Sequence, residues 1–240
     1  MATTTIRRAE PKAKRQDSWQ TIAKFIKFFI GLFLIPACLG ISVASVRLFF
    51  APFTILREQF WFFAGFSAYV LIYSILQNPI KTYVFGHELS HAIWTWMFRG
   101  KVLGFRASAS GGSVMVSKTN VFISLAPYFF PIYTVLAIAA YLIAKAFWKV
   151  EPYFEAYRFL LGFTWAFHLI LTVYVMLKGQ DDLRENGTFF SVIFIYFVNV
   201  LCLGLLMVYL SDYVTLEEYF KSVWDHGCFQ YIRAVSLTKM

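Results

Sequence analysis

Two histidines and a glutamate lie within one short apolar segment of the chain, Phe85–His91, whose sequence is FGHELSH. His87 and His91 are four residues apart, so a helix would place them on one face about one turn apart, where both can bind one metal ion. Glu88 follows the first histidine and can reach a water molecule on that metal without being a ligand itself. The pattern predicts a metal site beside a general base.

Chance is the alternative explanation for so short a motif. The chain has 4 His among 240 residues, and a single buried histidine is usually only a hydrogen-bonded side chain. Here, however, two histidines flank an acid, and no Lys or Arg lies between Lys81 and Arg99. Ionisable side chains at membrane depth are costly and are by default functional. We therefore favour the metal site over a structural role.

The composition is that of a membrane protein. Hydrophobic residues make up 59% of the chain and charged residues only 15%, whereas about 25% charged residues are usual in a soluble domain. The motif segment, Thr82–Phe98, is accompanied by five apolar runs, each near the roughly 20 residues that cross a bilayer as a helix. These runs are Phe28–Val46, Phe60–Ile80, Val121–Ala144, Phe159–Leu177 and Phe189–Leu210. The sequence predicts an all-α polytopic membrane protein with about six transmembrane helices.

The net charge of +9 is explained by membrane electrostatics better than by nucleic-acid binding. Basic residues are concentrated near the N-terminus and beside the apolar runs, where Lys and Arg favour the cytoplasmic side. No cleavable signal peptide is evident. We expect a basic cytoplasmic arm over residues 1–20, a transmembrane domain over 21–210 with its core at about 60–210, and an interfacial or loose tail over 211–240.

Two segments depart from the pattern of plain membrane helices. The first, Arg99–Lys118, has short strand-like pieces on either side of Gly111-Gly112, which is typical of a hairpin turn; an ordinary interfacial loop is the alternative. Open strand edges cannot face lipid, so a hairpin would lie at the interface or in a protein-lined cavity. The second contains Pro127 and Pro131, either of which would kink a helix.

A catalytic zinc ion usually has three protein ligands and an open position for water, so a third ligand is needed. Asp181 and Asp182 follow the run that ends at Leu177, where a carboxylate can lean towards a metal on a neighbouring helix. Helix capping is the alternative, because Asp182 with Glu185 three residues later resembles a capping box. One aspartate can cap while the other ligates, and we favour one of the pair as the ligand.

Two buried polar residues are further candidates for the site. His168 lies within an apolar run and can line the cavity, hydrogen-bond the substrate or stabilise an oxyanion. A structural histidine bonded to another helix is the alternative. Asn199, in the last run, is a similar candidate.

With these features the chain resembles the site-2 protease family of intramembrane zinc metalloproteases. The resemblance rests on the histidine motif in a membrane helix, the Gly-rich segment after it and an aspartate at the end of a later run, and it covers about residues 60–210. It implies that His87 and His91 bind one Zn²⁺, that Glu88 is the general base, and that Asp182, with Asp181 as the alternative, is the third ligand. The aspartate lacks the glycine that often follows it in the family, so we expect a compact, divergent member.

The resemblance implies hydrolysis of a peptide bond in or near a transmembrane segment of a membrane-protein substrate. Glu88 would activate the water on the zinc ion, whose pKa the metal lowers towards about 7. A substrate helix hides its carbonyls in internal hydrogen bonds and must unwind before it is cut. The strand-like segment around Gly111 and Gly112 can pair with the unwound stretch, and His168 is a further substrate-binding candidate.

Two other functions remain open from the sequence. A membrane zinc endopeptidase that acts on soluble or lipidated tails more often uses a glutamate as third ligand, and Glu185 is the nearest candidate. A non-catalytic, metal-dependent membrane scaffold, transporter or chaperone would not need the glutamate between the histidines, so Glu88 argues against it. Nucleic-acid binding has no support beyond the basic arm.

Overall fold

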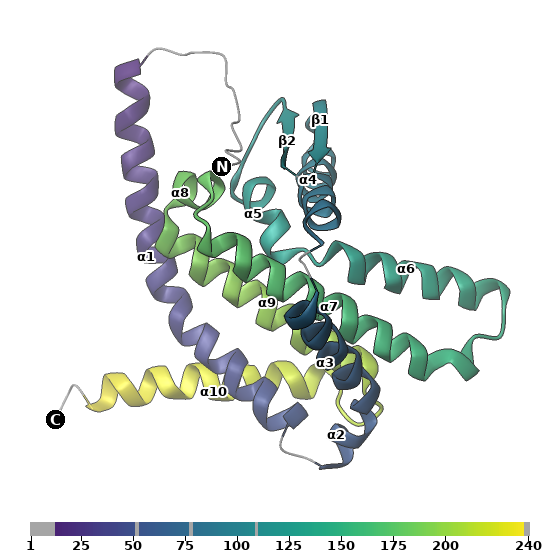
Figure 1. Ribbon diagram of the computed structural model, residues 1–240. Helices are drawn as coiled ribbons and strands as arrows, with labels where there is room; N and C mark the ends of the chain where they lie inside the picture. The colour runs from purple at the N-terminus through teal and green to yellow at the C-terminus, as the bar shows by residue number, and fades with distance from the viewer. Residues whose placement is uncertain (1–12, 51–52, 77–78, 109, 238–240) are drawn as a thin grey trace. The chain divides into compact units, whose positions relative to one another are not determined.

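The computed structural model describes residues 13–50, 53–76, 79–108 and 110–237, which form an α-helical protein with one small hairpin (Figure 1). The predicted all-α class, with a hairpin after the motif helix, is confirmed. Residues 1–12, which make up most of the predicted basic arm, lie outside the described residues. The described residues divide into two compact units, one drawn from the ranges 13–18 and 61–186 and the other from the ranges 19–60 and 187–237.

The first unit holds the histidine motif, and all but one residue of α3 belongs to it. Its elements are α3 (Phe60–Ile75), α4 (Ile80–Met97), β1 (Val102–Ser108), β2 (Gly111–Val116), α5 (Val121–Phe129), α6 (Ile132–Phe147), a 3₁₀ turn (Glu151–Tyr153), α7 (Phe154–Leu177) and α8 (Asp181–Asn186). α3 and α7 touch at their backbones, because a Cβ added to Gly162 would lie 1.9 Å from the carbonyl oxygen of Phe62. Such close contacts through small residues are typical of membrane helices.

The second unit is built from α1 (Ala13–Ser45, from Trp19 on) with its π-helical extension (Val46–Phe50), α2 (Phe53–Glu58), α9 (Thr188–Leu210) and α10 (Leu216–Leu237). α1 and α9 are joined by a hydrogen bond of 2.8 Å between the hydroxyls of Ser42 and Tyr196. Thr215 and Glu218 form a reciprocal capping box at the start of α10, and Tyr219 on that helix is fully buried. The described part of the predicted tail therefore contains a helix that begins at Leu216 and buries Tyr219.

The motif helix α4 begins directly after Pro79, a residue that is tolerated where a helix starts because its missing N–H has no intrahelical partner. At the other end the chain reverses at Arg99, whose φ is 58°. The amides of Arg99 and Gly100 donate to the carbonyls of Trp96 and Thr95, which closes the helix C-terminus. The reversal leads directly into the hairpin.

The hairpin pairs β1 with β2 in antiparallel register from Val102↔Val116 to Ser108↔Gly111. The turn therefore lies between Ser108 and Gly111, and the prediction that Gly111-Gly112 forms it is wrong. The hydroxyl of Ser108 donates to the Gly111 carbonyl at 2.7 Å, so a serine side-chain hydrogen bond links the two ends of the turn. Gly112 is a strand residue that lies directly against α4. Because it has no side chain, β2 can pack closely on that helix.

The predicted kink in the proline-containing run is confirmed. α5 ends at Phe129, α6 begins after Pro131, and the two helices meet at 75°. Pro131 cannot continue α5 because it has no N–H to donate. The bend separates a short helix beside the motif from a longer one that packs on α7.

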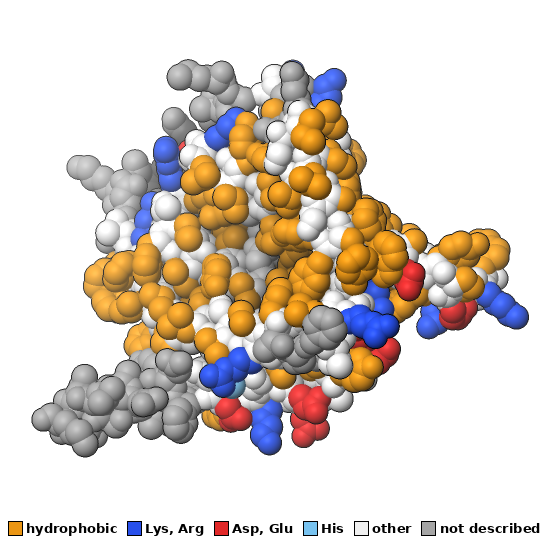
Figure 2. Space-filling model, turned by 60° about the horizontal axis from the view of Figure 1, so that its bottom comes forward, with side chains coloured by type: hydrophobic (Ala, Val, Ile, Leu, Met, Phe, Trp, Pro, Cys, Tyr) orange, Lys and Arg blue, Asp and Glu red, His pale blue; other side chains and the backbone are white. Residues whose placement is uncertain are grey.

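Three helical segments in the described part of the chain are long and apolar enough to cross a bilayer: Thr21–Phe50, Glu151–Leu177 and Thr188–Leu210. The bent pair α5–α6 makes a fourth if it is one span. The predicted six are not reached by this criterion, since α3 has only 16 residues and α4 carries the ionisable motif. Figure 2 shows hydrophobic side chains over most of one face, with charged ones towards its margins. These features fit a membrane protein.

Candidate metal centre

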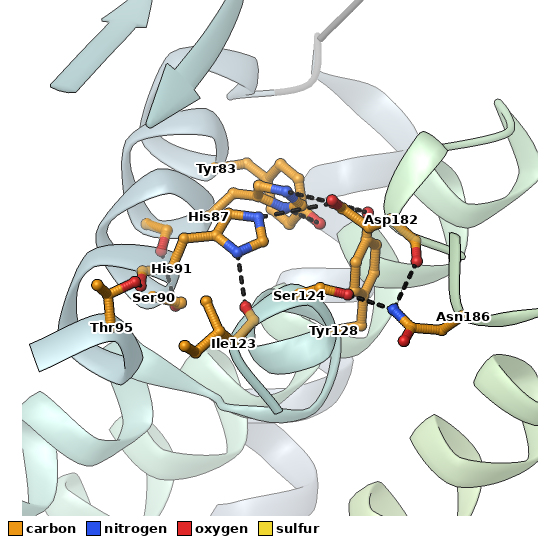
Figure 3. A network of polar contacts seen from close by, with 11 residues as sticks. Tyr83, His87, Ser90, His91, Thr95, Ile123, Ser124, Tyr128, Asp182 and Asn186 are labelled. Atoms are coloured by element: carbon orange, nitrogen blue, oxygen red, sulfur yellow. Dashed lines mark hydrogen bonds and ion pairs between the residues drawn. The ribbon is translucent and has the colours of Figure 1, made fainter. Parts of the chain in front are cut away.

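The structure brings His87, His91 and Asp182 together inside the first unit (Figure 3). α4 supplies both histidines from one face, and α8 supplies the aspartate. One ligand atom from each residue lies within 4.8 Å of the others, and all three side chains are buried. A buried group of this composition can hold a metal ion.

The spacing of the donor atoms suits a shared ion better than direct hydrogen bonds. Asp182 Oδ2 lies 3.9 Å from His87 Nε2 and 3.6 Å from His91 Nε2, which is longer than ordinary hydrogen bonds. Two ligands of a tetrahedral zinc ion, with bonds near 2.0–2.1 Å, are roughly 3.4 Å apart. Two imidazoles and one carboxylate are also a donor set that zinc accepts in catalytic sites.

Asp182 is the aspartate that faces the histidines. Its side chain is buried, whereas Asp181 and Glu185 on the same short helix are exposed. Burial by itself raises the pKa of Asp182, but the imidazoles of His87 and His91 lower that pKa by more, so it lies well below its usual range.

Each histidine has a partner for its second ring nitrogen. His91 Nδ1 lies 2.7 Å from the main-chain carbonyl of Ile123 on α5. A carbonyl only accepts hydrogen bonds, so this contact places the proton on Nδ1 and leaves Nε2 for a metal. His87 Nδ1 lies 3.4 Å from the hydroxyl of Tyr83, one turn earlier on α4.

The aspartate is held by groups that the sequence analysis missed. The hydroxyl of Tyr128 donates to Asp182 Oδ2 at 3.2 Å. The amide of Asn186 donates to the main-chain carbonyl of Asp182 at 3.1 Å and also to the hydroxyl of Ser124 on α5. The i, i+4 spacing of Asp182 and Asn186 could have indicated that Asn186 lies beside the aspartate on a helix. Tyr128, in contrast, is one of 14 tyrosines, and nothing in the sequence distinguishes it.

Glu88 is buried, with 3% of its surface exposed, and β2 lies against it. A Cβ added to Gly112 would stand 2.6 Å from both Cγ and Oε1 of Glu88. The strand can approach this closely only because Gly112 has no side chain. The hairpin and the carboxyl group of the motif are therefore in direct contact.

A small cavity adjoins the cluster, with room for about one water molecule. Its wall includes His87, Ser90, Tyr133 and His168, so the structure places the predicted His168, on α7, beside the same space as a motif histidine. Asn199 belongs to the second unit, where its amide donates to the Ile195 carbonyl of its own helix at 2.9 Å.

Comparisons of the chain with protein-family models, with curated proteins and with solved structures found no match.

Proposed function

We propose that the protein is an intramembrane zinc metalloprotease that hydrolyses a peptide bond in or near a transmembrane segment of a membrane-protein substrate. The observation that carries the proposal is the buried cluster of His87, His91 and Asp182, with Glu88 next to the first histidine. Such a cluster in an apolar, helical chain supports metal-dependent hydrolysis at membrane depth. With α3 and α4 counted as shorter membrane-embedded helices, we propose six helical segments that enter or cross the bilayer.

The residues divide the chemistry among themselves. His87, His91 and Asp182 would hold one Zn²⁺, which when bound supplies a Lewis acid and lowers the pKa of water. Glu88 accepts the proton of the water that attacks the peptide carbonyl and then donates that proton to the leaving amine. Its burial keeps competing bulk water away from the proton transfer.

The hairpin provides a place for an unwound substrate. A transmembrane helix must open locally to expose a carbonyl, and an extended stretch can add to a strand edge. β2 places Gly112, the residue after Gly111, directly beside Glu88, so a substrate strand paired there would run past the general base. His168, on the cavity wall, would contact the substrate next to His87.

The proposal is tested by replacing Glu88 with glutamine, which keeps the shape of the side chain but cannot take a proton. The purified Glu88→Gln variant and the unaltered protein are reconstituted with a panel of tagged single-span proteins that carry helix-breaking residues. We expect the unaltered protein to cleave members of the panel and the variant to cleave none, while both contain about one zinc ion. Equal cleavage by the two proteins would remove Glu88 from the mechanism.

A non-catalytic role makes the opposite prediction for the unaltered protein. A metal-dependent scaffold or chaperone would contain zinc and bind panel members without cutting any of them. Glu88→Gln would then leave both zinc content and binding unchanged.

A further inference from the structure

We infer that Tyr128 is a positioning residue of the metal centre: its hydroxyl holds Asp182 where the carboxylate can share an ion with the two histidines. The inference rests on the metal centre of the proposed function. It assigns a role to a residue outside the histidine motif and on an element that carries no proposed ligand.

Tyr128 contacts the carboxylate oxygen of Asp182 that also faces the two histidines. Tyr128 donates its hydroxyl proton to Asp182 Oδ2 at 3.2 Å, and Oδ2 is also the oxygen that faces both imidazoles, at 3.6 and 3.9 Å. A carboxylate oxygen has two lone pairs, so Oδ2 can accept this hydrogen bond and still offer a lone pair to an ion. Figure 3 shows Tyr128 beside Asp182 and the histidines.

Tyr128 also contacts a second proposed ligand. Its ring lies edge-on to the imidazole of His87, with 5.2 Å between ring centroids and an interplanar angle of 89°. The side chain is fully buried, and close packing of the interior restricts its movement away from either neighbour. On the same helix, the Ile123 carbonyl contacts His91. α5 therefore touches all three ligand residues.

Asp182 needs such support because of where it lies. It is the second residue of α8, a helix of only six residues, and helices this short are not stable by themselves. Its position relative to α4, about ninety residues earlier in the chain, must come from tertiary contacts. The hydroxyl of Tyr128 donates a hydrogen bond to its carboxylate, while the amide of Asn186, which also donates to Ser124, holds its main-chain carbonyl.

The test compares Tyr128→Phe with the unaltered full-length protein in detergent micelles. Zinc affinity is measured by competition with a chromophoric chelator, and the visible spectrum is recorded after loading with Co²⁺. Loss of a partner of this kind typically lowers metal affinity by about 10- to 100-fold, and we expect a decrease of that size. We also expect shifted Co²⁺ bands, because the carboxylate is no longer fixed; a purely structural role would not shift them.

Tyr69→Phe is the matched control. Tyr69, on α3 of the same unit, is also buried, and its hydroxyl has no hydrogen-bond partner in the described part of the structure. Its removal should change neither affinity nor spectrum. Identical affinity and Co²⁺ bands in Tyr128→Phe and the unaltered protein would overturn the inference. Failure of the unaltered protein itself to bind zinc would instead overturn the proposed function.

If Tyr128→Phe does not fold, site-specific replacement by 3-fluorotyrosine keeps the ring and strengthens the hydroxyl as a donor. The Co²⁺ bands should then shift relative to the unaltered protein. Unchanged bands in this variant would count against the inference.

Discussion

Asp182 and its neighbours show how strongly the chemistry depends on single residues. The cluster places one carboxylate oxygen opposite two imidazole nitrogens, and the adjacent acidic residues on α8 point elsewhere. Removing one member of such a set leaves the remaining donors too few to hold an ion in a catalytic geometry.

Replacement of the acidic residues one at a time identifies the third ligand. We expect Asp182→Ala to lose most bound zinc, because its side chain is buried beside the histidines. Asp181→Ala and Glu185→Ala should retain about one ion, since both side chains are exposed. Metal content of the purified variants, measured by mass spectrometry, decides the matter. Zinc loss in Glu185→Ala would favour the endopeptidase that acts on soluble or lipidated tails.

Some residues of the site could be predicted from the sequence and others could not. His87 and His91 could be paired because a helix brings residues four apart onto one face. Asp181 and Asp182 are neighbours in sequence, and only the packing of α8 distinguishes the buried side chain from the exposed one. Tyr128 contributes through tertiary proximity alone, which no local pattern encodes.

At the scale of elements, the hairpin and α4 pack together, and both carry residues of the proposed active site. β2 lies against Glu88 through Gly112, so the strand that we propose to bind substrate also packs on the proposed general base. A side chain at this position must displace Glu88 or the strand, because no free space separates them.

Gly112→Ala should therefore lower proteolysis while zinc content is unchanged. The added Cβ would meet Glu88 at 2.6 Å, and misplacing a reacting group by about 1 Å can reduce the rate by about 100-fold. Gly104→Ala is the control on the facing strand, where the nearest contact of an added Cβ is 3.6 Å. Cleavage of the panel substrates by both variants is the measurement, and equal activity would argue against the proposed role of Glu88 beside this strand.

Helix identity was predictable at this scale, whereas strand detail was not. Apolar runs indicated the helices, and the two prolines of one run indicated a bend, because hydrophobic length and a missing N–H act locally; the bend lies at Pro131, whereas Pro127 is inside α5. Gly111 and Gly112 were assigned to the turn because glycine favours turns. Glycine also permits close backbone approach, and its use at Gly112 depends on Glu88, which is distant in sequence.

At the scale of the whole molecule, the span count depends on elements that are neither typical spans nor loops. α3 and α4 are too short or too polar to qualify by length and composition, and α5–α6 is bent by 75°. Sequence runs of suitable total length therefore overestimate the number of straight spans. The N-terminal orientation stays a prediction from basic residues in the arm.

Metal removal tests how far the centre contributes to the whole protein. The ligands come from two helices far apart in sequence, so an ion that bridges them should stabilise the folded first unit. Chelation should abolish cleavage and lower the thermal unfolding temperature, and added zinc should restore both. Zinc at about 100 times its dissociation constant would stabilise the fold by about 2.7 kcal/mol. Unfolding temperatures that are the same with and without chelator would contradict a bridging ion.

The contact between His91 and the carbonyl of Ile123 has a consequence for natural variation. Every amino acid at position 123 carries the same peptide oxygen, so changes of that side chain cannot delete the acceptor, although they can move it. The hydroxyl groups that contact His87 and Asp182 belong to the side chains of Tyr83 and Tyr128. A single substitution at position 83 or 128 therefore removes the contact. Random substitutions should therefore remove the contacts that position His87 and Asp182 sooner than the contact that positions His91.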